Sequence, residues 1–288
     1  MTLPQISFEF FPPRTIEASF RLHDAIGALA PLGPRFVSVT YGAGGTTRDL
    51  TQQAVVALQT NSGLNVAAHL TCVDASRDET LAIADKFAAA GVKGLVALRG
   101  DPPAGEDGFV PHPDGFRSSC ELISALADRG WRDIRVGAYP NTHPEARDMR
   151  ADIDWLKRKT DAGATEALTQ FFFEADTFLR FRDACADAGI TAPITPGILP
   201  IENWGGTKRF ATRCGTPVPN WLADAFDKAE RDDRHDLLAI SVCTELCSDL
   251  MSEGVDNLHF YTLNKPHMTR EVCQAIGLTP AVELRNVA

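Results

Sequence analysis

Short apolar runs alternate with longer amphipathic stretches along the whole chain. Strands that are buried on both faces have nearly continuous runs of this kind, so each run predicts a strand of a covered, parallel sheet. The first four runs begin about 30 residues apart, which is the length of a strand–helix unit. The runs are Gln5–Phe10, Arg35–Thr40, Asn65–Leu70, Gly94–Leu98, Arg135–Tyr139, Glu166–Phe171, Thr191–Ile198 and Asn257–Tyr261.

The stretches between these runs have the periodicity of helices. Ile153, Leu156 and Thr160, for example, lie on one face of a helix that should end at Gly163. Glycines at 33, 63, 91 and 189 hold corresponding positions after other helical stretches. Because strands alternate with helices, the pattern predicts a parallel sheet.

Eight strands in about 260 residues is the number found in a closed (β/α)₈ barrel. We therefore predict an α/β fold, a TIM barrel formed by a single domain over residues 1–288, because no linker or low-complexity tract divides the chain. The long interval 199–256 has room for the seventh helix and one extra helix before the eighth strand. An open, doubly wound sheet is the competing fold.

The composition narrows the class of protein. Of the 288 residues 44% are hydrophobic, which excludes a disordered chain, and no run approaches the ~18 consecutive apolar residues of a membrane span. The first residues lack the basic and apolar regions of a signal peptide. The net charge of −10 argues against a broad nucleic-acid surface. Seven cysteines without a C-x-x-C pair favour a reducing compartment, so we expect a cytoplasmic protein with no membrane and no nucleic-acid partner.

Polar and ionisable residues follow nearly every predicted strand, although the strands themselves are apolar. In TIM barrels the active site forms at the carboxyl ends of the strands. This concentration of chemistry-bearing side chains therefore predicts an enzyme. The residues at these ends include Glu9, Thr40, Tyr41, His69, Arg99, Asp101, Tyr139, Gln170 and Tyr261.

Glu9 lies in the segment Ile6–Phe11, between aromatic residues. Burial among apolar groups disfavours a charged carboxylate, so we expect the pKa of Glu9 to be raised. A raised pKa would make Glu9 a general acid near neutral pH. The alternative is a structural glutamate bonded to neighbouring backbone or to an arginine.

Other polar patterns allow more than one interpretation. Gly42–Gly45 resembles a phosphate-binding loop but lacks the third glycine of G-x-G-x-x-G, and a tight turn is an equal alternative. Arg99 and Asp101 should favour each other's charged form, or form only a structural ion pair. His69, His143 and Asp101 lack the spacing of a metal motif, so we expect no catalytic metal.

A basic turn occurs in one predicted helix. Asp152 and Lys159 lie two turns apart on one face of it, and Leu156–Lys159 carries three basic residues in succession. Such a turn is usually a solvated helix face, but beside an anionic cofactor it would contact phosphate. The residues alone leave both interpretations open.

Taken together, nine segments of the chain resemble the flavin-dependent 5,10-methylenetetrahydrofolate reductases. They occur in the order of that family between residues 7 and 264, which makes the resemblance specific although no single segment is decisive. The segments are Ser7–Arg14, Ser38–Gly45, His69–Cys72, Ala97–Asp101, Ala138–Pro140 with His143–Ala146, Leu156–Ala164, Thr169–Phe173, Pro196–Pro200 and His259–Asn264.

The resemblance implies a (β/α)₈ barrel with non-covalently bound FAD and a ping-pong reaction, in which NADH or NADPH passes hydride to the flavin and leaves. Methylenetetrahydrofolate would then bind at the same face, its five-membered ring would open to an N5 iminium, and hydride transfer would give 5-methyltetrahydrofolate. Glu9 would protonate the departing nitrogen, and Asp101 would bind the pterin edge and stabilise the iminium. The family also implies a homo-oligomer, a place in one-carbon metabolism and methionine biosynthesis and, for this chain, no regulatory domain.

The contacts of the family transfer to this chain residue by residue. Gln170 and Phe210 would serve folate and nicotinamide in turn, and Tyr261 and Lys265 would also contact substrate. Lys265 replaces an arginine of some relatives, which loses the two-pronged geometry suited to a carboxylate, and Gly206 replaces a glutamine. The expected FAD contacts are Thr40, Tyr41, Ala43, His69, Arg99, Gly100, Asp101, Tyr139, His143, Ala146, Asp152, Arg158 and Lys159.

Two other functions compete with this one. A metal-dependent TIM-barrel hydrolase would keep the fold but would need a stoichiometric metal ion. A non-catalytic folate-binding protein would show neither nicotinamide-dependent flavin reduction nor folate turnover.

Overall fold

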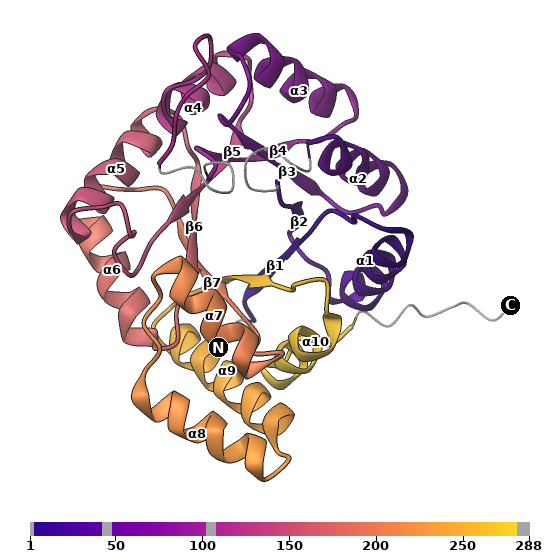
Figure 1. Ribbon diagram of the computed structural model, residues 1–288, viewed down its shortest axis with the longest axis vertical. Coiled ribbons are helices and arrows are strands. Elements are labelled where there is room, and N and C mark those ends of the chain that lie inside the picture. The colour runs from indigo at the N-terminus through magenta and orange to yellow at the C-terminus, as the bar shows by residue number, and fades with distance from the viewer. Residues whose placement is uncertain (1–2, 42–47, 102–107, 281–288) are drawn as a thin grey trace, which may run out of the picture.

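The computed structural model describes residues 3–41, 48–101 and 108–280 of the chain. Eight parallel strands follow one another around a closed barrel in chain order, and the last strand pairs with the first (Figure 1). The predicted barrel is therefore confirmed, and the open sheet is excluded. The strands are β1 (Gln5–Phe10), β2 (Phe36–Val39), β3 (Val66–Thr71), β4 (Gly94–Leu98), β5 (Asp133–Ala138), β6 (Glu166–Phe171), β7 (Ile194–Ile198) and β8 (Asn257–Tyr261).

Helices connect the strands and enclose the barrel. Three helices lie between β7 and β8, one more than the interval was expected to hold, and α8 lies outside α9 at the edge of the molecule (Figure 1). The five glycines predicted to end helices all have positive φ. The helices are α1 (Ile16–Leu29), the short 3-10 helix η1 (Ala30–Leu32), α2 (Arg48–Asn61), α3 (Arg77–Ala89), α4 (Ser119–Asp128), α5 (Met149–Asp161), α6 (Ala175–Asp187), α7 (Trp204–Cys214), α8 (Asn220–Arg231), α9 (His235–Ser252) and α10 (Pro266–Ala275).

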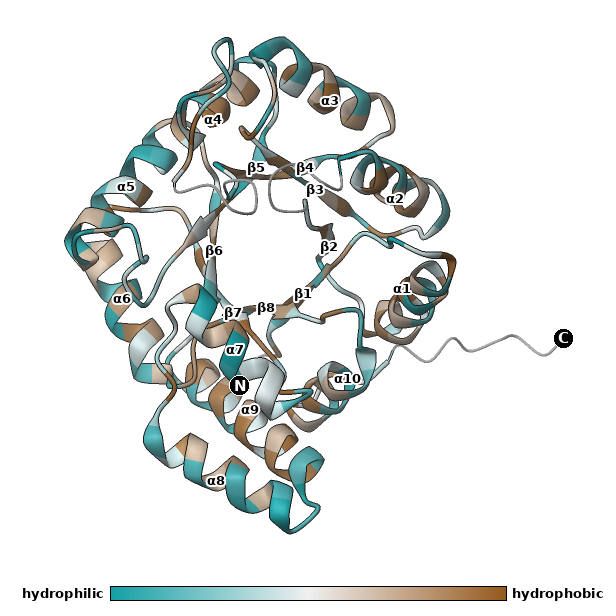
Figure 2. Ribbon diagram, viewed as in Figure 1, coloured by the Kyte–Doolittle hydropathy of each residue, from teal (hydrophilic) through white to brown (hydrophobic). Residues whose placement is uncertain are grey.

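The main hydrophobic core lies between the strands and the surrounding helices. Figure 2 shows apolar residues along the strands and on the helix faces turned toward them. Along β1, Ile6, Phe8 and Phe10 belong to this outer core. Side chains alternate across a strand, so Ser7 and Glu9 point into the barrel. No helix in the described ranges is both long and apolar enough to cross a membrane.

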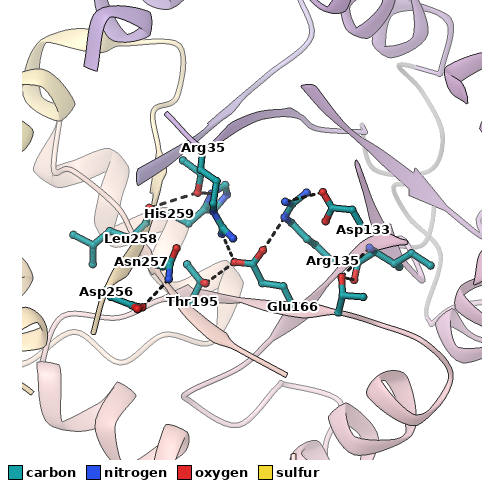
Figure 3. Close-up of polar contacts among 12 residues, drawn as sticks. Arg35, Asp133, Arg135, Glu166, Thr195, Asp256, Asn257, Leu258 and His259 are labelled. Carbon is teal, nitrogen blue, oxygen red and sulfur yellow. Dashed lines mark hydrogen bonds and ion pairs between the residues drawn. The ribbon is translucent and has the colours of Figure 1, made fainter. Parts of the chain in front are cut away.

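The amino-terminal end of the barrel interior is closed by a charged network (Figure 3). Glu166 lies between two arginines, pairing with Arg35 and, at 2.8 Å, with Arg135, and Thr195 Oγ1 donates to the same carboxylate. Arg135 also pairs with Asp133 at 3.0 Å. These charges are the floor of the barrel, and the candidate site lies at the opposite end.

Candidate active site

Glu9 lies near the carboxyl end of β1 and projects into the barrel between two histidines. Its Oε2 is 3.3 Å from Nε2 of His69 on β3 and 3.7 Å from Nε2 of His259 on β8. The three side chains are 16%, 7% and 0% exposed, respectively. Neither Nε2 atom has a hydrogen-bond partner with good geometry, so the nearest polar atom available to both is the carboxylate.

The environment of Glu9 lowers its pKa instead of raising it. Burial by itself would raise the pKa of Glu9. The two imidazoles of His259 and His69, as hydrogen-bond partners of the carboxylate and through their charge, outweigh burial and lower the pKa to about 2. The expectation of a raised pKa is therefore wrong. The apolar residues that suggested it are neighbours along β1, whereas the groups that decide the pKa lie across the barrel.

A second layer of contacts orients His259. Its Nδ1 lies 2.8 Å from Oγ of Ser7, and its ring stacks on Phe36 with centroids 5.6 Å apart. The guanidinium of Arg135 covers the Phe36 ring at 3.6 Å. Ser7 and His259 were not among the expected site residues. Their signal was present in the sequence, because each lies two positions before an expected site residue, Glu9 or Tyr261, and so shares its face of the strand.

Tyr261 lies beside Glu9 in the register of β1 and β8. Its hydroxyl donates to the Thr169 carbonyl at 2.6 Å, and burial raises its pKa well above the ordinary value, with the Glu9 charge adding to the effect. Gly197 provides the space for this ring, because a Cβ there would lie 2.6 Å from Tyr261 Cε2 and 2.1 Å from the Thr169 oxygen. Any larger residue at 197 would displace Tyr261.

The carboxyl ends of β4 and β5 carry the charged part of the site. Arg99 pairs with Glu145 at 2.6 Å, so its ion-pair partner is Glu145, which the sequence did not identify. Asp101 is exposed and acts on its neighbours through its charge. Burial raises the pKa of Tyr139 to about 12, with Asp101 contributing, and Tyr139 packs edge-on against His143 at 4.5 Å.

The basic turn of α5 is divided between two environments. Lys159 points inward, where its Nζ donates to the Gly137 carbonyl of β5 at 2.8 Å, and desolvation lowers its pKa to about 8. Arg158 is exposed, 5.8 Å from the Trp155 ring. Asp152 accepts the backbone N–H of His143 at 2.7 Å and so fixes the loop after β5. The interpretation of the basic turn as a solvated helix face therefore applies to Arg158 but not to Lys159.

Three of the expected substrate contacts lie on the β6–β8 side. Gln170 is half-buried near the end of β6, and Phe210 on α7 stacks on Phe171 at 5.1 Å. Lys265 is the N-cap residue of α10. Cys214 at the end of α7 is a further neighbour that the sequence did not identify. Burial raises the pKa of its thiol, and the charge of Asp101 adds to the effect.

The remaining expected cofactor contacts are placed by the loops after β2, β4 and β5. Thr40 donates its N–H to the Phe10 carbonyl at 2.9 Å, and the Tyr41 hydroxyl accepts from Arg48 at 2.9 Å. Gly100 has φ +89°, and Ala146 donates its N–H to the His143 carbonyl at 2.8 Å. Ala43 and the glycine-rich loop Gly42–Gly45 lie outside the described residues.

A carboxylate between two buried imidazoles, two half-buried tyrosines, the inward-pointing Lys159 and the ion-paired Arg99 all lie at the carboxyl end of one parallel barrel. This arrangement defines a class: a TIM-barrel enzyme whose site can bind anions and move protons. In the described part of the chain, no group of three or more His, Cys, Asp or Glu side chains is arranged to hold a metal ion.

The comparisons with known proteins specify the family. The family model for methylenetetrahydrofolate reductase matches residues 2–277. The 5,10-methylenetetrahydrofolate reductase of Pectobacterium carotovorum subsp. carotovorum is 43% identical over 96% of this chain and 91% of its own length, and that of Escherichia coli K12 is 42% identical over 96% and 92%. Methylenetetrahydrofolate reductase (NADH) 1 of Arabidopsis thaliana is 34% identical over 94% of this chain and 48% of its own length. The chain belongs to the methylenetetrahydrofolate reductase family and is an oxidoreductase.

A solved structure supports the fold independently. An uncharacterized protein from Clostridium thermocellum, described as binding two copies of 5-methyl-5,6,7,8-tetrahydrofolic acid, superimposes with a TM-score of 0.60. The alignment covers 95% of this chain and 94% of that one. With 15% sequence identity, the likeness concerns the fold alone.

Proposed function

We propose that this protein interconverts 5,10-methylenetetrahydrofolate and 5-methyltetrahydrofolate with NADH or NADPH as the second substrate, through bound FAD. The single observation that carries the proposal is the carboxylate of Glu9 between His69 and His259, within a chain of this family. The two bacterial relatives are named for reduction of this folate, and the plant relative is named for NADH.

The residues at the ends of β4 and β5 fit an anionic dinucleotide. Arg99 and Lys159 supply two positive charges there, and His143 supplies an imidazole. Lys159 is a desolvated cation whose pKa falls to about 8, so an added negative charge beside it would be favourable. When bound, FAD would accept a hydride from the nicotinamide and give one to the folate. Arg99, His143 and Lys159 would hold its charged part.

Glu9 would supply the proton that ring opening requires. With a pKa of about 2 the carboxylate is ionised at neutral pH in the free protein, so it would have to take up a proton before ring opening. The proton would then pass from the Glu9 carboxyl group to the departing nitrogen of the folate ring. His69 Nε2 lies 3.3 Å from Glu9 Oε2, close enough to exchange a proton with the carboxylate.

The other site residues would bind and orient substrate. The exposed carboxylate of Asp101 would stabilise the cationic iminium, and Tyr139 and Tyr261 would line the same mouth of the barrel. Gln170 and Phe210 would contact the nicotinamide and the folate in turn, which is what a ping-pong reaction at a single face requires.

Half-reactions measured anaerobically test the proposal. The purified protein should bind FAD, NADH or NADPH should reduce the flavin, and methylenetetrahydrofolate should reoxidise it. Glu9→Gln should keep the first half-reaction and slow the second by about 10²–10⁴-fold, the usual contribution of general acid catalysis. Glu17→Gln, at an exposed position of α1, is the matched control and should match the wild type.

Several outcomes would contradict this function. Protein that cannot be loaded with FAD, or a Glu9→Gln variant with unchanged folate turnover, would overturn it. Stoichiometric metal with hydrolytic activity would favour the hydrolase, and folate binding without either half-reaction would favour a binding protein.

The setting of the enzyme is part of the proposal. Residues 1–288 would form one FAD-binding catalytic domain that acts in the cytoplasm, in one-carbon metabolism and methionine biosynthesis. It would act on small molecules, as a homo-oligomer, with neither nucleic acid nor membrane as a partner. Light scattering of the FAD-loaded protein would measure its oligomeric state.

A further inference from the structure

The loop that follows β8 has an unusual backbone. Leu263 and Asn264 are consecutive and both left-handed, with φ of +51° and +57°. Asparagine tolerates this conformation, but a leucine rarely adopts it, and such strain persists only where the surrounding structure enforces it. The loop lies directly beyond Tyr261, so the strain is stored at the mouth of the candidate site.

The side chain of Asn264 explains what the strained backbone achieves. Its Oδ1 accepts the N–H of Phe11 at 2.8 Å, and its Nδ2 donates to the Phe11 carbonyl at 3.0 Å. The backbone register of β1 and β8 ends at Glu9 and Tyr261. The side-chain amide of Asn264 therefore extends the pairing of the two strands beyond their last backbone partners. We call these two hydrogen bonds to Phe11 the Asn264 clamp.

The sequence after Glu9 needs such a clamp. Phe11 is followed by Pro12 and Pro13, which have no N–H to donate, so the N–H of Phe11 is the last donor before Arg14. Thr262 secures the other side of this short segment, because its Oγ1 donates to the Glu9 carbonyl at 2.7 Å and its N–H does so at 3.2 Å. The backbone of Glu9 is held from the β8 loop by Thr262, and that of Phe11 by Asn264.

We propose that Asn264 is a positioning residue for Glu9, fixing the end of β1 so that the Glu9 carboxylate stays between His69 and His259. The proposal rests on the proposed function in taking Glu9 as the proton donor. The clamp also couples this donor to the candidate folate contact, because Lys265 directly follows Asn264 and its N–H donates to the Thr262 carbonyl at 2.8 Å. One set of hydrogen bonds thus holds both the proton donor and the folate contact.

Asn264→Gly isolates the clamp, because glycine keeps the left-handed backbone without strain and removes only the side-chain amide. Flavin content and reduction by nicotinamide should stay within about twofold of the wild type. Folate-dependent reoxidation should fall roughly tenfold to a hundredfold, as expected for a donor displaced by a fraction of an ångström or more. The pH profile of that half-reaction should also shift, because the distances from Glu9 to the imidazoles change.

Leu263→Gly is the matched control, since it relieves the neighbouring left-handed strain and keeps the amide. It should leave both half-reactions close to the wild type. Hydrogen exchange adds a readout that needs no turnover: the Phe11 amide should be protected in the wild type and in Leu263→Gly, and exchange faster in Asn264→Gly.

Each failure has a distinct signature. A wild-type flavin that methylenetetrahydrofolate does not reoxidise would overturn the proposed function, whatever the variants do. With an active wild type, an unchanged folate half-reaction in Asn264→Gly, equal losses in both half-reactions, or an equal loss in Leu263→Gly would overturn the positioning role.

Discussion

Glu9 has apolar neighbours along the chain and two imidazoles across the barrel. Phe8 and Phe10 point outward to the helices, so they exert little influence on the carboxylate that alternates with them. The histidines come from β3 and β8, far away in the sequence. The presence of an important carboxylate at the end of β1 could be inferred from residue pattern, but the direction of its pKa shift required the spatial neighbours.

Lys159 offers a residue-level test of the cofactor site. Its pKa falls from an ordinary 10.5 to about 8 through desolvation, so between these values the FAD-free protein holds it largely neutral. An anionic cofactor favours the protonated form, and binding should therefore take up about one proton per FAD in this pH range. Calorimetric titration in two buffers of different ionisation enthalpy measures that uptake.

Two variants sharpen the Lys159 test. Lys159→Met should abolish the proton uptake and weaken FAD binding. Lys157→Met is the matched control, because Lys157 pairs at the surface with Asp161 at 2.9 Å, and it should behave as the wild type. Equal proton uptake in the Lys159 variant would show that another group is responsible.

At the scale of the elements, helix boundaries follow local rules that the sequence carries. Ser76 caps α3: its hydroxyl accepts the Glu79 N–H at 3.2 Å, and the Glu79 carboxylate accepts the Ser76 N–H at 2.8 Å. Ser76→Ala removes one half of this capping box. It should lower the free energy of unfolding by about 1 kcal/mol, within the 0.5–2 range for lost caps.

Urea denaturation of Ser76→Ala and of a control variant measures how much the cap contributes to the free energy of unfolding. Ser241→Ala is the control, since Ser241 is exposed on α9 and its hydroxyl donates only to the Leu237 carbonyl within the helix. It should change the free energy of unfolding by no more than about 0.5 kcal/mol. A loss in Ser76→Ala no larger than in Ser241→Ala would contradict the role of the capping box.

The strand elements were predictable because strands buried on both faces must be apolar throughout. Four of the eight, including β1 and β6, have the predicted bounds, and the others differ by up to three residues at an end. The interval between β7 and β8 was less predictable. Its three helices include α8, which packs on α9 and on Trp204 of α7 and has no place in the regular strand–helix alternation.

At the scale of the whole molecule, the charged floor of the barrel joins distant segments. Glu166 is buried and held by Arg35, Arg135 and Thr195. Glu166→Gln leaves the buried guanidinium of Arg135 with Asp133 as its remaining carboxylate partner, and breaking a buried pair of this kind costs up to about 3–5 kcal/mol of unfolding free energy. Chemical denaturation should show this loss, whereas Asp161→Asn, which breaks the exposed pair with Lys157, should cost less than about 1 kcal/mol.

The same network predicts a pH dependence of stability. Burial would raise the pKa of Glu166, but the arginines and Thr195 lower it below its ordinary 4.5. A carboxylate with a depressed pKa stabilises the folded state above its ordinary pKa and loses this contribution as the pH falls through the folded value. Below pH 4.5 the wild type should therefore lose stability more steeply than Glu166→Gln; parallel curves would contradict the network.

The sequence by itself determined the strand–helix alternation, the barrel and the strand ends that carry Glu9, Arg99, Asp101 and Tyr139, because these depend on local hydrophobic periodicity. Only the tertiary structure decided which groups face one another. Barrel closure brings His69 and His259 to Glu9, pairs Arg99 with Glu145, and lets Asn264 reach Phe11. These contacts depend on strand register and on distances across the closed barrel, which no local pattern of residues encodes.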